Sequence, residues 1–328
     1  MRNNLNIFNF SPNISWGGLS QNSNAIHLLE QNVDKINWYW LSANPNAIHL
    51  LEQNVDKLDW FYLSANPNAI HLLEQNVDKI YWSQLSINSN PNAIHLFKKH
   101  INRIHWNMLS INSNPNAIHL LEQNVDKINC NGLSQNPNAI HLLEKNVDKI
   151  NWSWLSMNPN AIHLLEQNMD KINWRLLSKN PNAIQLLEQN VDKIDWHVLS
   201  ENPNAIHLLE QNVGKINWLW LSINPNAIHL LEQNIDKIDW WNLSANPNAI
   251  HLLEQNMDKI NWMWLSANPN AIHLLAPLNH EQMRIQNKEF FQELVQFVCH
   301  PTWLCKCASR LNMDLDEYQY LLMECNVF

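Results

Sequence analysis

Four residues near the end of the chain are of types that bind metal ions. They are Cys299, His300, Cys305 and Cys307, and thiolates with imidazoles are usual ligands of a tetrahedral zinc ion. Their order, Cys-His-x4-Cys-x-Cys, departs from the two-plus-two spacing of common zinc modules. A free cysteine often serves as a small buried hydrophobe. We therefore expect structural cysteines here, with zinc as the less favoured alternative, and no cofactor.

A histidine that recurs along the chain offers a second set of metal ligands. It stands at equivalent positions, with Gln185 as the one replacement: His27, His49, His71, His95, His119, His141, His163, His207, His229, His251 and His273. Stacked helical repeats lie about 8–10 Å apart, whereas each ligand of a zinc ion lies about 2 Å from the metal. The spacing therefore favours a solvated row of histidines, or a row hydrogen-bonded between repeats.

The rest of the sequence gives no sign of catalysis. It has no nucleophile beside a general base, no glycine-rich phosphate loop and no carboxylate pair that stands apart from the repeating pattern. We therefore expect neither enzymatic activity nor a small-molecule substrate.

The histidines belong to a unit that repeats almost unchanged. Its Ala-Ile pair recurs at intervals of 22 residues, except for two intervals of 24 where Ser89-Asn90 and Ser113-Asn114 are added. The pairs begin at Ala25, Ala47, Ala69, Ala93, Ala117, Ala139, Ala161, Ala183, Ala205, Ala227, Ala249 and Ala271. A fixed period of this length is typical of a stacked repeat array.

One copy, residues 44–65, contains the signals for two short helices. Asn44 is a suitable N-cap and Pro45 a suitable first residue for a helix that carries the Ala-Ile-His-Leu-Leu segment. A second helix is expected from Val55 to about Ala65. Such short helices need neighbours for stability. The predicted fold is all-α, an α-solenoid of about twelve short helix pairs with a helical C-terminal cap.

The period divides the chain into three parts. Residues 1–20 are expected to form a tail and a degenerate half-repeat, which caps the array by turning its outer face to water. Residues 21–276 hold the tandem repeats, and residues 277–328 read as amphipathic helices that cap the other end. We expect these parts to form an elongated arc or superhelix, since neighbouring repeats advance by about 9 Å.

The composition of the chain indicates which classes of partner it is expected to bind. The net charge is −9, whereas nucleic-acid-binding proteins usually present a basic face. No stretch approaches the roughly 18 consecutive apolar residues of a membrane span. Five cysteines, four of them in the last thirty residues, do not resemble a disulfide framework. We expect an intracellular protein that binds neither nucleic acid nor membrane.

A tryptophan also recurs, in the second helix of each copy. It stands at Trp16, Trp38, Trp60, Trp82, Trp106, Trp152, Trp174, Trp196, Trp218, Trp240 and Trp262, and Cys130 replaces it once. Aromatic rows bind single-stranded nucleic acid by stacking when they line a basic groove. The acidic composition favours packing within and between the repeats instead.

The copies differ mainly at the first, second and fifth residues after this tryptophan. The first and fifth lie four residues apart, so they share one face of the helix. Drift at exposed sites and a partner-binding surface both explain the variation, and repeat proteins commonly bind through such surfaces. Because aromatic residues and arginine dominate interface hot spots, the partner-binding candidates are Tyr39, Phe61, Arg175, Lys179, His197, Trp241 and Met263.

The repeated words resemble one protein family. Asn-Pro-Asn-Ala-Ile-His-Leu-Leu-Glu-Gln-Asn, the returning Ile-Asn-Trp-x-x-Leu-Ser-x-Asn-Pro and the late Phe-Gln-Glu-Leu-Val-Gln-Phe-Val-Cys-His-Pro look like the tandem short-helix repeat proteins of giant DNA viruses of protists. The resemblance covers nearly the whole chain. It implies a viral protein in the host cytoplasm, or packaged in the virion, and it carries over no catalytic residues.

These features predict a non-enzymatic scaffold for protein–protein interaction, whose partner is unknown. The alternative is a structural protein of the virion, in which rods associate side by side. A weaker alternative is an adaptor that recruits host machinery through its C-terminal helices.

Overall fold

The computed structural model describes residues 10–277 and residue 314, and Ser11–Leu275 form one compact unit. The described residues contain 24 α-helices and no β-strand, which confirms an all-α solenoid. The expected metal-ligand cluster and most of the expected C-terminal cap lie outside the described residues.

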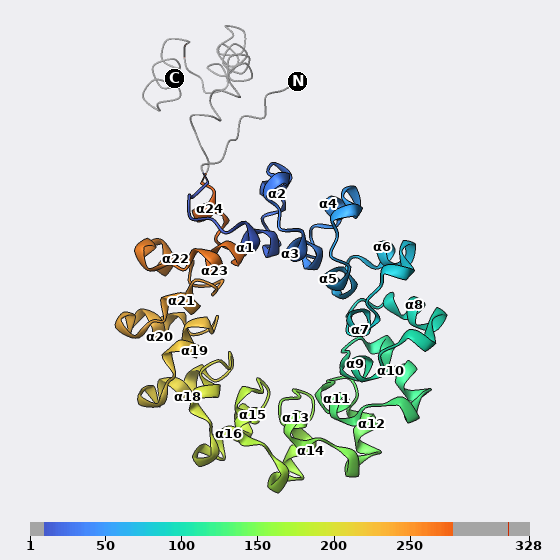
Figure 1. The fold of residues 1–328 in the computed structure, drawn as a ribbon. Coiled ribbons are helices and arrows are strands. Elements are labelled where there is room, and N and C mark those ends of the chain that lie inside the picture. The colour runs from blue at the N-terminus through green and yellow to red at the C-terminus, as the bar shows by residue number, and fades with distance from the viewer. Residues whose placement is uncertain (1–9, 278–313, 315–328) are drawn as a thin grey trace. The chain divides into compact units, whose positions relative to one another are not determined.

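The α-helices alternate between two layers (Figure 1). The inner layer consists of α1 (Trp16–Gln21), α3 (Trp38–Ala43), α5 (Trp60–Ala65), α7 (Trp82–Leu85), α9 (Trp106–Ile111), α11 (Cys130–Gln135), α13 (Trp152–Ser156), α15 (Trp174–Lys179), α17 (Trp196–Leu199), α19 (Trp218–Ile223), α21 (Trp240–Leu243) and α23 (Trp262–Ala267). The outer layer consists of α2 (Ile26–Glu30), α4 (Ile48–Gln53), α6 (Ile70–Gln75), α8 (Ala93–Lys99), α10 (Pro115–Glu122), α12 (Ile140–Glu144), α14 (Ile162–Glu166), α16 (Ile184–Glu188), α18 (Ile206–Glu210), α20 (Ile228–Glu232), α22 (Ile250–Glu254) and α24 (Ile272–Leu275).

A short 3-10 helix joins each outer helix to the next inner one. These are η1 (Val33–Lys35), η2 (Val55–Lys57), η3 (Val77–Lys79), η4 (Ile101–Arg103), η5 (Val125–Lys127), η6 (Val147–Lys149), η7 (Met169–Lys171), η8 (Val191–Lys193), η9 (Val213–Lys215), η10 (Ile235–Lys237) and η11 (Met257–Lys259).

The second helix of each copy is thus shorter than the sequence predicts. The backbone is extended at Leu58, with φ −67° and ψ 136°, and at Asp59. Asp59 then caps α5 by accepting a hydrogen bond from the backbone N–H of Tyr62 at 3.1 Å. An Asp or Asn before the tryptophan is a strong N-cap, so the expected helix from Val55 breaks into a 3-10 turn and a new α-helix.

The expected cap at Asn44 is also wrong, because this asparagine ends α3 instead of starting α4. Its Nδ2 donates to the carbonyl oxygens of Ser20, at 3.0 Å, and Asn22, at 3.2 Å, in the preceding repeat. Its Oδ1 accepts from the backbone N–H of Asn46. A buried amide side chain needs such partners for all its polar atoms, and here they join one repeat to the next.

This asparagine forms a row through the whole array. Every member is almost completely buried and donates to two carbonyls of the preceding repeat. The row consists of Asn22, Asn44, Asn66, Asn88, Asn112, Asn136, Asn158, Asn180, Asn202, Asn224, Asn246 and Asn268. We call it the asparagine row.

Apolar side chains fill the space between the two layers. Leu41 of α3 and Leu51 of α4 are fully buried, as is Ala47 between them. The same positions are buried in the other copies. Because each short helix buries one apolar side against its neighbours, its stability comes from this packing more than from its own hydrogen bonds.

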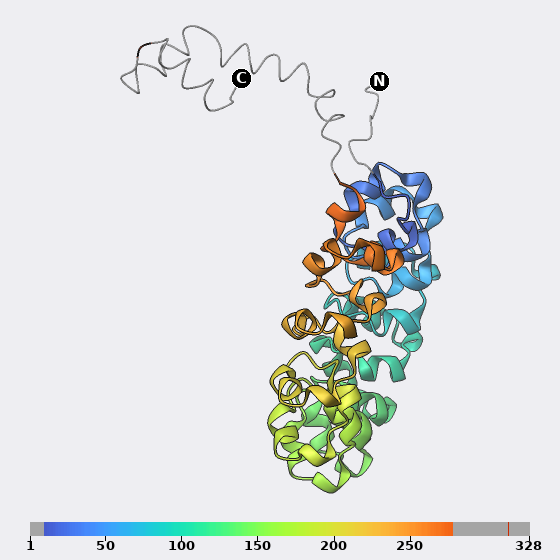
Figure 2. The ribbon, with the colours of Figure 1, turned by 90° about the vertical axis from the view of Figure 1, so that its left-hand side faces the viewer.

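The array closes into a ring, which the sequence analysis does not anticipate. Helix α1 packs against α23, and the circle is complete in face view (Figure 1) and is seen from the side in Figure 2. At this seam the backbone N–H of Ser15 donates to Ser266 Oγ at 2.9 Å. Asn22 Nδ2 donates to the carbonyls of Ser266 and Asn268 at 3.2 and 2.8 Å. The asparagine row therefore has no end.

Closure corrects two expectations. The Ser11–Leu275 unit is not an open arc or elongated superhelix. The half-repeat that contains α1 is not a cap with its outer face in water either, because that face meets α23. The physical reason is the turn made at each junction: twelve equal junctions close a circle when each turns by about 30°.

The two longer copies keep the row in register. Asn88 and Asn90 make the bonds that Asn44 and Asn46 make elsewhere. The extra residues therefore fall just after them, at Pro91 and Asn92, where the outer helix starts. In the next copy the added length extends α10 to eight residues with Asn114 as its N-cap.

Candidate functional site

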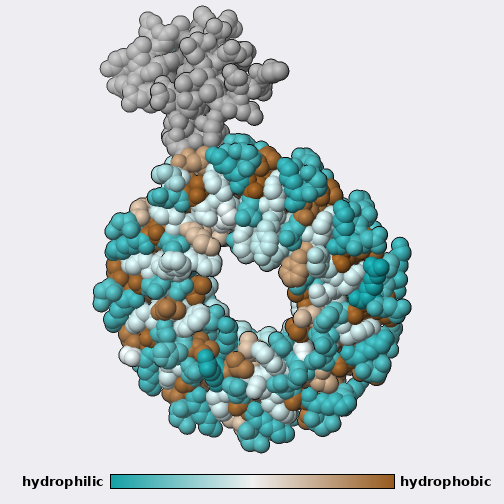
Figure 3. Space-filling view, viewed as in Figure 1, coloured by the Kyte–Doolittle hydropathy of each residue, from teal (hydrophilic) through white to brown (hydrophobic). Residues whose placement is uncertain are grey.

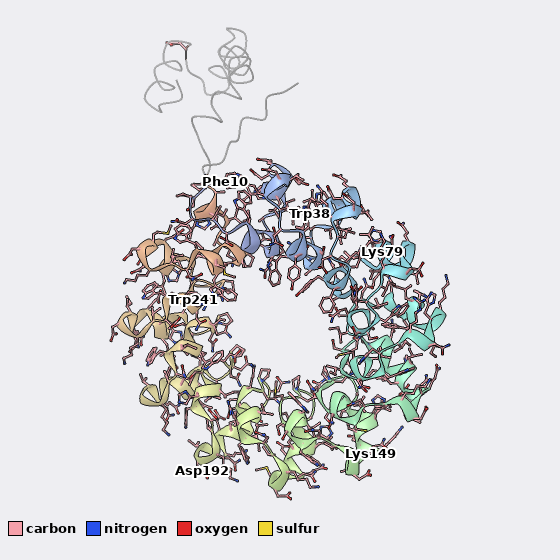
Figure 4. All side chains as sticks on the ribbon, in the orientation of Figure 1. Phe10, Trp38, Lys79, Lys149, Asp192 and Trp241 are labelled. Carbon is pink, nitrogen blue, oxygen red and sulfur yellow. The ribbon has the colours of Figure 1, made fainter. Side chains whose placement is uncertain are left out.

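The three variable positions of each copy face the opening of the ring. In α3 the residues on the opposite side, Leu41 and Ser42, are fully buried. At 100° per residue, Tyr39, Trp40 and Ala43 point away from that buried side. The inner helices surround the opening (Figure 1), and their side chains project into it (Figure 4). We call the first, second and fifth residues after the tryptophan position, on all twelve inner helices, the inner wall.

Four of the predicted residues are exposed apolar side chains of this wall. The exposed fraction is 44% for Tyr39, 38% for Phe61, 58% for Trp241 and 55% for Met263. They lie on α3, α5, α21 and α23. Large apolar side chains with such exposure make up a surface that a partner could cover.

The other three predicted residues meet in one place. Arg175, Lys179 and His197 line a hollow of about 490 Å³ between α15 and α17. Lys179 Nζ lies 2.9 Å from Glu201 Oε2, and Arg175 Nε lies 3.8 Å from Asp195 Oδ2. Both cations therefore already pair with the following repeat, so they are less available to a partner than the sequence suggests.

Aromatic rings contact one another along the wall. Tyr39 and Tyr62 are neighbours with ring centroids 4.1 Å apart, and their hydroxyl groups are hydrogen-bonded. This bond, and to a lesser extent desolvation, raises the pKa of Tyr62 above its ordinary value. Phe61 packs edge-on against Tyr81 at 5.5 Å, beside a hollow of about 530 Å³. The surface is therefore corrugated, with clefts between rings.

The sequence analysis noted the variable second position but selected no residue there. Trp154, Trp220 and Trp264 occupy it and are each 40–42% exposed. The signal was present, because these are large aromatic residues at a position free to change. It was missed because the first and fifth positions were grouped as one face, although the second lies only 60° from the fifth at 100° per residue.

Seven of the eight Trp, Tyr and Phe residues of the wall gather on one half of the ring, and the eighth, Trp154, lies on α13 in the other half. Six successive inner helices, α19, α21, α23, α1, α3 and α5, carry seven of them; we call these helices the aromatic half. The seven are Trp220, Trp241, Trp264, Tyr39, Trp40, Phe61 and Tyr62. The wall positions of this half include no Asp, Glu, Lys or Arg.

The remaining inner helices, α7 to α17 in odd numbers, form the polar half. Their wall residues include Ser83, Asn107, Asn131 and Ser153 as well as the charged hollow on α15 and α17. The same half also exposes three apolar side chains, Ile87, Ile111 and Trp154. In the space-filling view, hydrophilic residues dominate the outer rim, whereas pale and hydrophobic residues are more frequent beside the opening (Figure 3). The acidic character of the chain is thus carried mainly outside the wall.

The histidine row lies on the outer helices and joins neighbouring repeats by hydrogen bonds, which was one of the two arrangements expected from the sequence. His163 Nε2 lies 3.0 Å from Glu144 Oε1 of the preceding repeat. Equivalent pairs are His49–Glu30, His71–Glu52, His141–Glu122, His207–Glu188, His229–Glu210, His251–Glu232 and His273–Glu254. In the part of the chain that the structure describes, no cluster of three or more His, Cys, Asp or Glu could hold a metal ion.

The tryptophan row also packs between repeats. Nine of the rings are covered by a lysine of the following repeat, as Lys57 Nζ lies 4.9 Å from the ring centre of Trp38. Eight further lysines make this contact at 4.4–4.9 Å, and Arg103 covers Trp82 at 5.8 Å. A cation over an aromatic face stabilises by about 0.5–1 kcal/mol at exposed sites. The recurring lysines thus stabilise the contacts between neighbouring repeats.

None of the helices among residues 10–277 is long and apolar enough to cross a membrane. Comparison with protein families, curated proteins and solved structures finds no match for this chain. The resemblance to the viral repeat proteins therefore stays a prediction, and the argument for function rests on the geometry of the ring.

Proposed function

We propose that this protein is a non-enzymatic scaffold that binds a protein partner on the inner wall of its ring. One observation carries the proposal. Most of the positions that stay constant between copies are buried or bonded to a neighbouring repeat, whereas the positions that vary most lie at the opening. Repeat proteins commonly bind on such a shared concave surface.

The chemistry of the wall supports a protein partner over nucleic acid. Among its variable positions the charged residues are Arg175, Lys179 and Glu201, and both cations are paired. A nucleic acid chain needs several free cations to replace its counterions. Exposed Trp, Tyr, Phe and Met are instead the residues enriched where proteins meet.

The proposed cellular location comes from the repeated sequence motifs. Their resemblance to repeat proteins of giant DNA viruses supports a viral protein that acts inside a host cell. The closed ring does not favour the alternative in which rods associate side by side in the virion, because the repeat array is not a rod.

The test compares two variants of the tagged full chain in infected host cells. The double variant Phe61→Ala with Trp241→Ala removes two exposed rings of the wall, and His163→Ala removes one outer contact as a matched control. Surface truncations of this kind should change stability by about 0.5 kcal/mol or less each. Quantitative mass spectrometry should find the captured partner depleted for the wall variant and unchanged for His163→Ala. The opposite pattern would show that the outer surface binds.

A further inference from the structure

The aromatic half of the wall exists as one surface because the ring is closed. Its members come from the two ends of the array: α19, α21 and α23 near the last repeat, and α3 and α5 near the first. Helix α1, with Gly17 and Gly18 at the first two wall positions, lies between the two groups. In an open array the two groups of aromatic residues would be separated by the whole length of the chain.

We propose that this aromatic half binds one amphipathic α-helix of a partner protein, which lies in the opening with its apolar face on the aromatic residues. The inference rests on the proposed function and specifies the partner. Three properties of the wall support it, namely size, backbone chemistry and charge.

The size of the opening excludes a folded domain of about 100 residues. Twelve inner helices at about 8–10 Å spacing give a circumference on the order of 100–120 Å, so opposite helix axes are about 31–38 Å apart. Subtracting one helix diameter of 10–12 Å leaves about 19–28 Å. A folded domain of 100 residues has a radius of gyration of about 13 Å, or roughly 33 Å across as a sphere. A single helix fits and reaches one side of the wall.

Backbone chemistry favours a helix over an extended segment. An extended segment leaves its N–H and C=O groups in need of partners, which a sheet edge would supply. The aromatic half is made of helices whose own backbone groups are bonded internally. Its polar wall groups are few: the amides of Gln21 and Asn242, the indole N–H groups of four tryptophans, and the two tyrosine hydroxyls, which bond each other. A helix satisfies its backbone hydrogen bonds itself, so it needs only apolar contact on that side.

Charge favours an amphipathic helix in one orientation. The wall positions of the aromatic half carry no Asp, Glu, Lys or Arg, so burying a charged helix face there would be costly. The polar half across the opening supplies asparagine, serine and the Arg175–Glu201 region.

The same chemistry disfavours the other linear polymers. A polysaccharide has many hydroxyl groups that need hydrogen-bond partners, which this half has in small number. A sugar ring also stacks on a flat aromatic face, and few faces are free where the aromatic rings pack edge-on against one another. Phe61 and Tyr62 pack in this way, with ring centroids 5.2 Å apart and planes at 72°. Single-stranded nucleic acid lacks the cations it needs here.

The test selects binders from displayed peptide libraries on the full chain. One library holds 18-residue peptides patterned as amphipathic helices with Leu, Ile, Met, Phe, Trp and Tyr varied at the apolar positions. A second has the same composition in strict alternation, as in a strand. Cellohexaose, maltohexaose and a 20-nucleotide oligo(dT) serve as non-protein probes. We expect binders from the helical library, with micromolar or tighter dissociation constants.

Variants then locate the binding site. Phe61→Ala with Trp241→Ala should weaken the selected peptides at least tenfold, and Gly18→Trp should do so by separating the two groups of aromatic residues while keeping all of them. The controls are His163→Ala on the outer surface and Asn131→Ala on the polar half, both expected to leave affinity within twofold. Circular dichroism verifies that each variant keeps its helices, and the truncations alone suffice if Gly18→Trp does not fold.

Several outcomes would overturn the inference. They are no enrichment from the helical library, preference for the alternating library, binding of a sugar or oligo(dT) that depends on the aromatic half, and peptides whose affinity is unchanged by both the aromatic and the seam variants. If the captured partner of the proposed-function test depends on the inner wall but these peptides do not, the scaffold function stands and the helical partner is wrong. If both depend on the outer surface, both proposals fail.

Discussion

Replacing Gly18 with tryptophan should open the ring at its seam. A Cβ atom at Gly18 would lie 2.6 Å from the backbone oxygen of Met263 and 2.9 Å from the Cβ of Ser266. Both are closer than real Cβ contacts allow, and a backbone oxygen has little freedom to move aside. Other copies carry tryptophan at this position, as Trp40 shows, so the residue suits the repeat but not this junction. The change should therefore displace α1 from α23.

The free energy at stake follows from the hydrogen bonds that join the two ends. Five hydrogen bonds join the two ends of the Ser11–Leu275 unit, and a net contribution of 0.5–1.5 kcal/mol each gives about 2.5–7.5 kcal/mol. Losing this junction leaves the other junctions intact, so the ring should open without unfolding. The five bonds are Ser11 N to Leu275 O, Ser15 N to Ser266 Oγ, Asn22 Nδ2 to Ser266 O and Asn268 O, and Asn24 Nδ2 to Pro269 O.

Small-angle scattering and amide hydrogen exchange measure the opening. The radius of gyration should rise, and the amides of α1 should exchange faster, while far-ultraviolet circular dichroism stays near that of the unchanged protein. The neighbouring change Gly17→Trp is the matched control, because a Cβ there is 3.7 Å or more from its nearest neighbours, Asn37 and Trp40. An unchanged radius and exchange for Gly18→Trp, or the same change for Gly17→Trp, would refute the reasoning.

Three further predictions concern single contacts. Asn158→Ala should lower the free energy of unfolding by about 1–3 kcal/mol for each buried group left without a partner, measured by urea denaturation; a loss near zero would contradict the role of the asparagine row. Tyr39→Phe should return the pKa of Tyr62 toward its ordinary value, seen as tyrosinate absorbance at lower pH; an unchanged titration would mean that their hydrogen bond does not form. Hydrogen bonds from His141 and then His119 lower the pKa of Glu122, so its contribution to stability is present above the ordinary carboxyl range and is lost as pH falls through the lowered pKa. His141→Gln should flatten that part of the stability–pH curve, and an unaltered curve would contradict it.

The fold class and the helix pairs could be predicted because they depend on local patterns. The period, the Ala-Ile-His-Leu-Leu stripe and the polar turns each indicate the same short helices, and consistent local signals are reliable. The boundaries were less certain. Asn44 has the right residue type for an N-cap, but its amide bonds the preceding repeat. A single copy of the sequence does not contain that neighbour.

The role of the recurring charged and aromatic residues could be predicted in part. The histidine spacing excluded a shared metal ion and left inter-repeat bonding, which is what His163 and Glu144 form. The partner itself lies 19 residues earlier in the chain, a separation that has no meaning until the rise between repeats is known. The lysine over each tryptophan was missed for the same reason.

Ring closure could not be predicted, since it depends on the sum of many small turns. An error of 5° at each of twelve junctions amounts to about 60°, which decides between a ring and an open superhelix. Gly17 and Gly18 replace larger residues of most other copies, which is the one local sign of this junction in the sequence. In the structure Gly18 allows α1 to approach α23 closely, as Gly132 does between α11 and α9.

Closure also changes how the variation between copies should be interpreted. Along the chain, Trp220, Trp241 and Trp264 sit far from Tyr39 and Phe61, and their similarity looks accidental. Around the ring they form one continuous half without charges, and the boundary between the halves follows no break in the repeat. If drift alone had filled these positions, aromatic residues should be scattered around all twelve inner helices. Seven of the eight lie on the two sides of the seam, with Trp154 as the exception, which favours a binding surface that depends on the ring being closed.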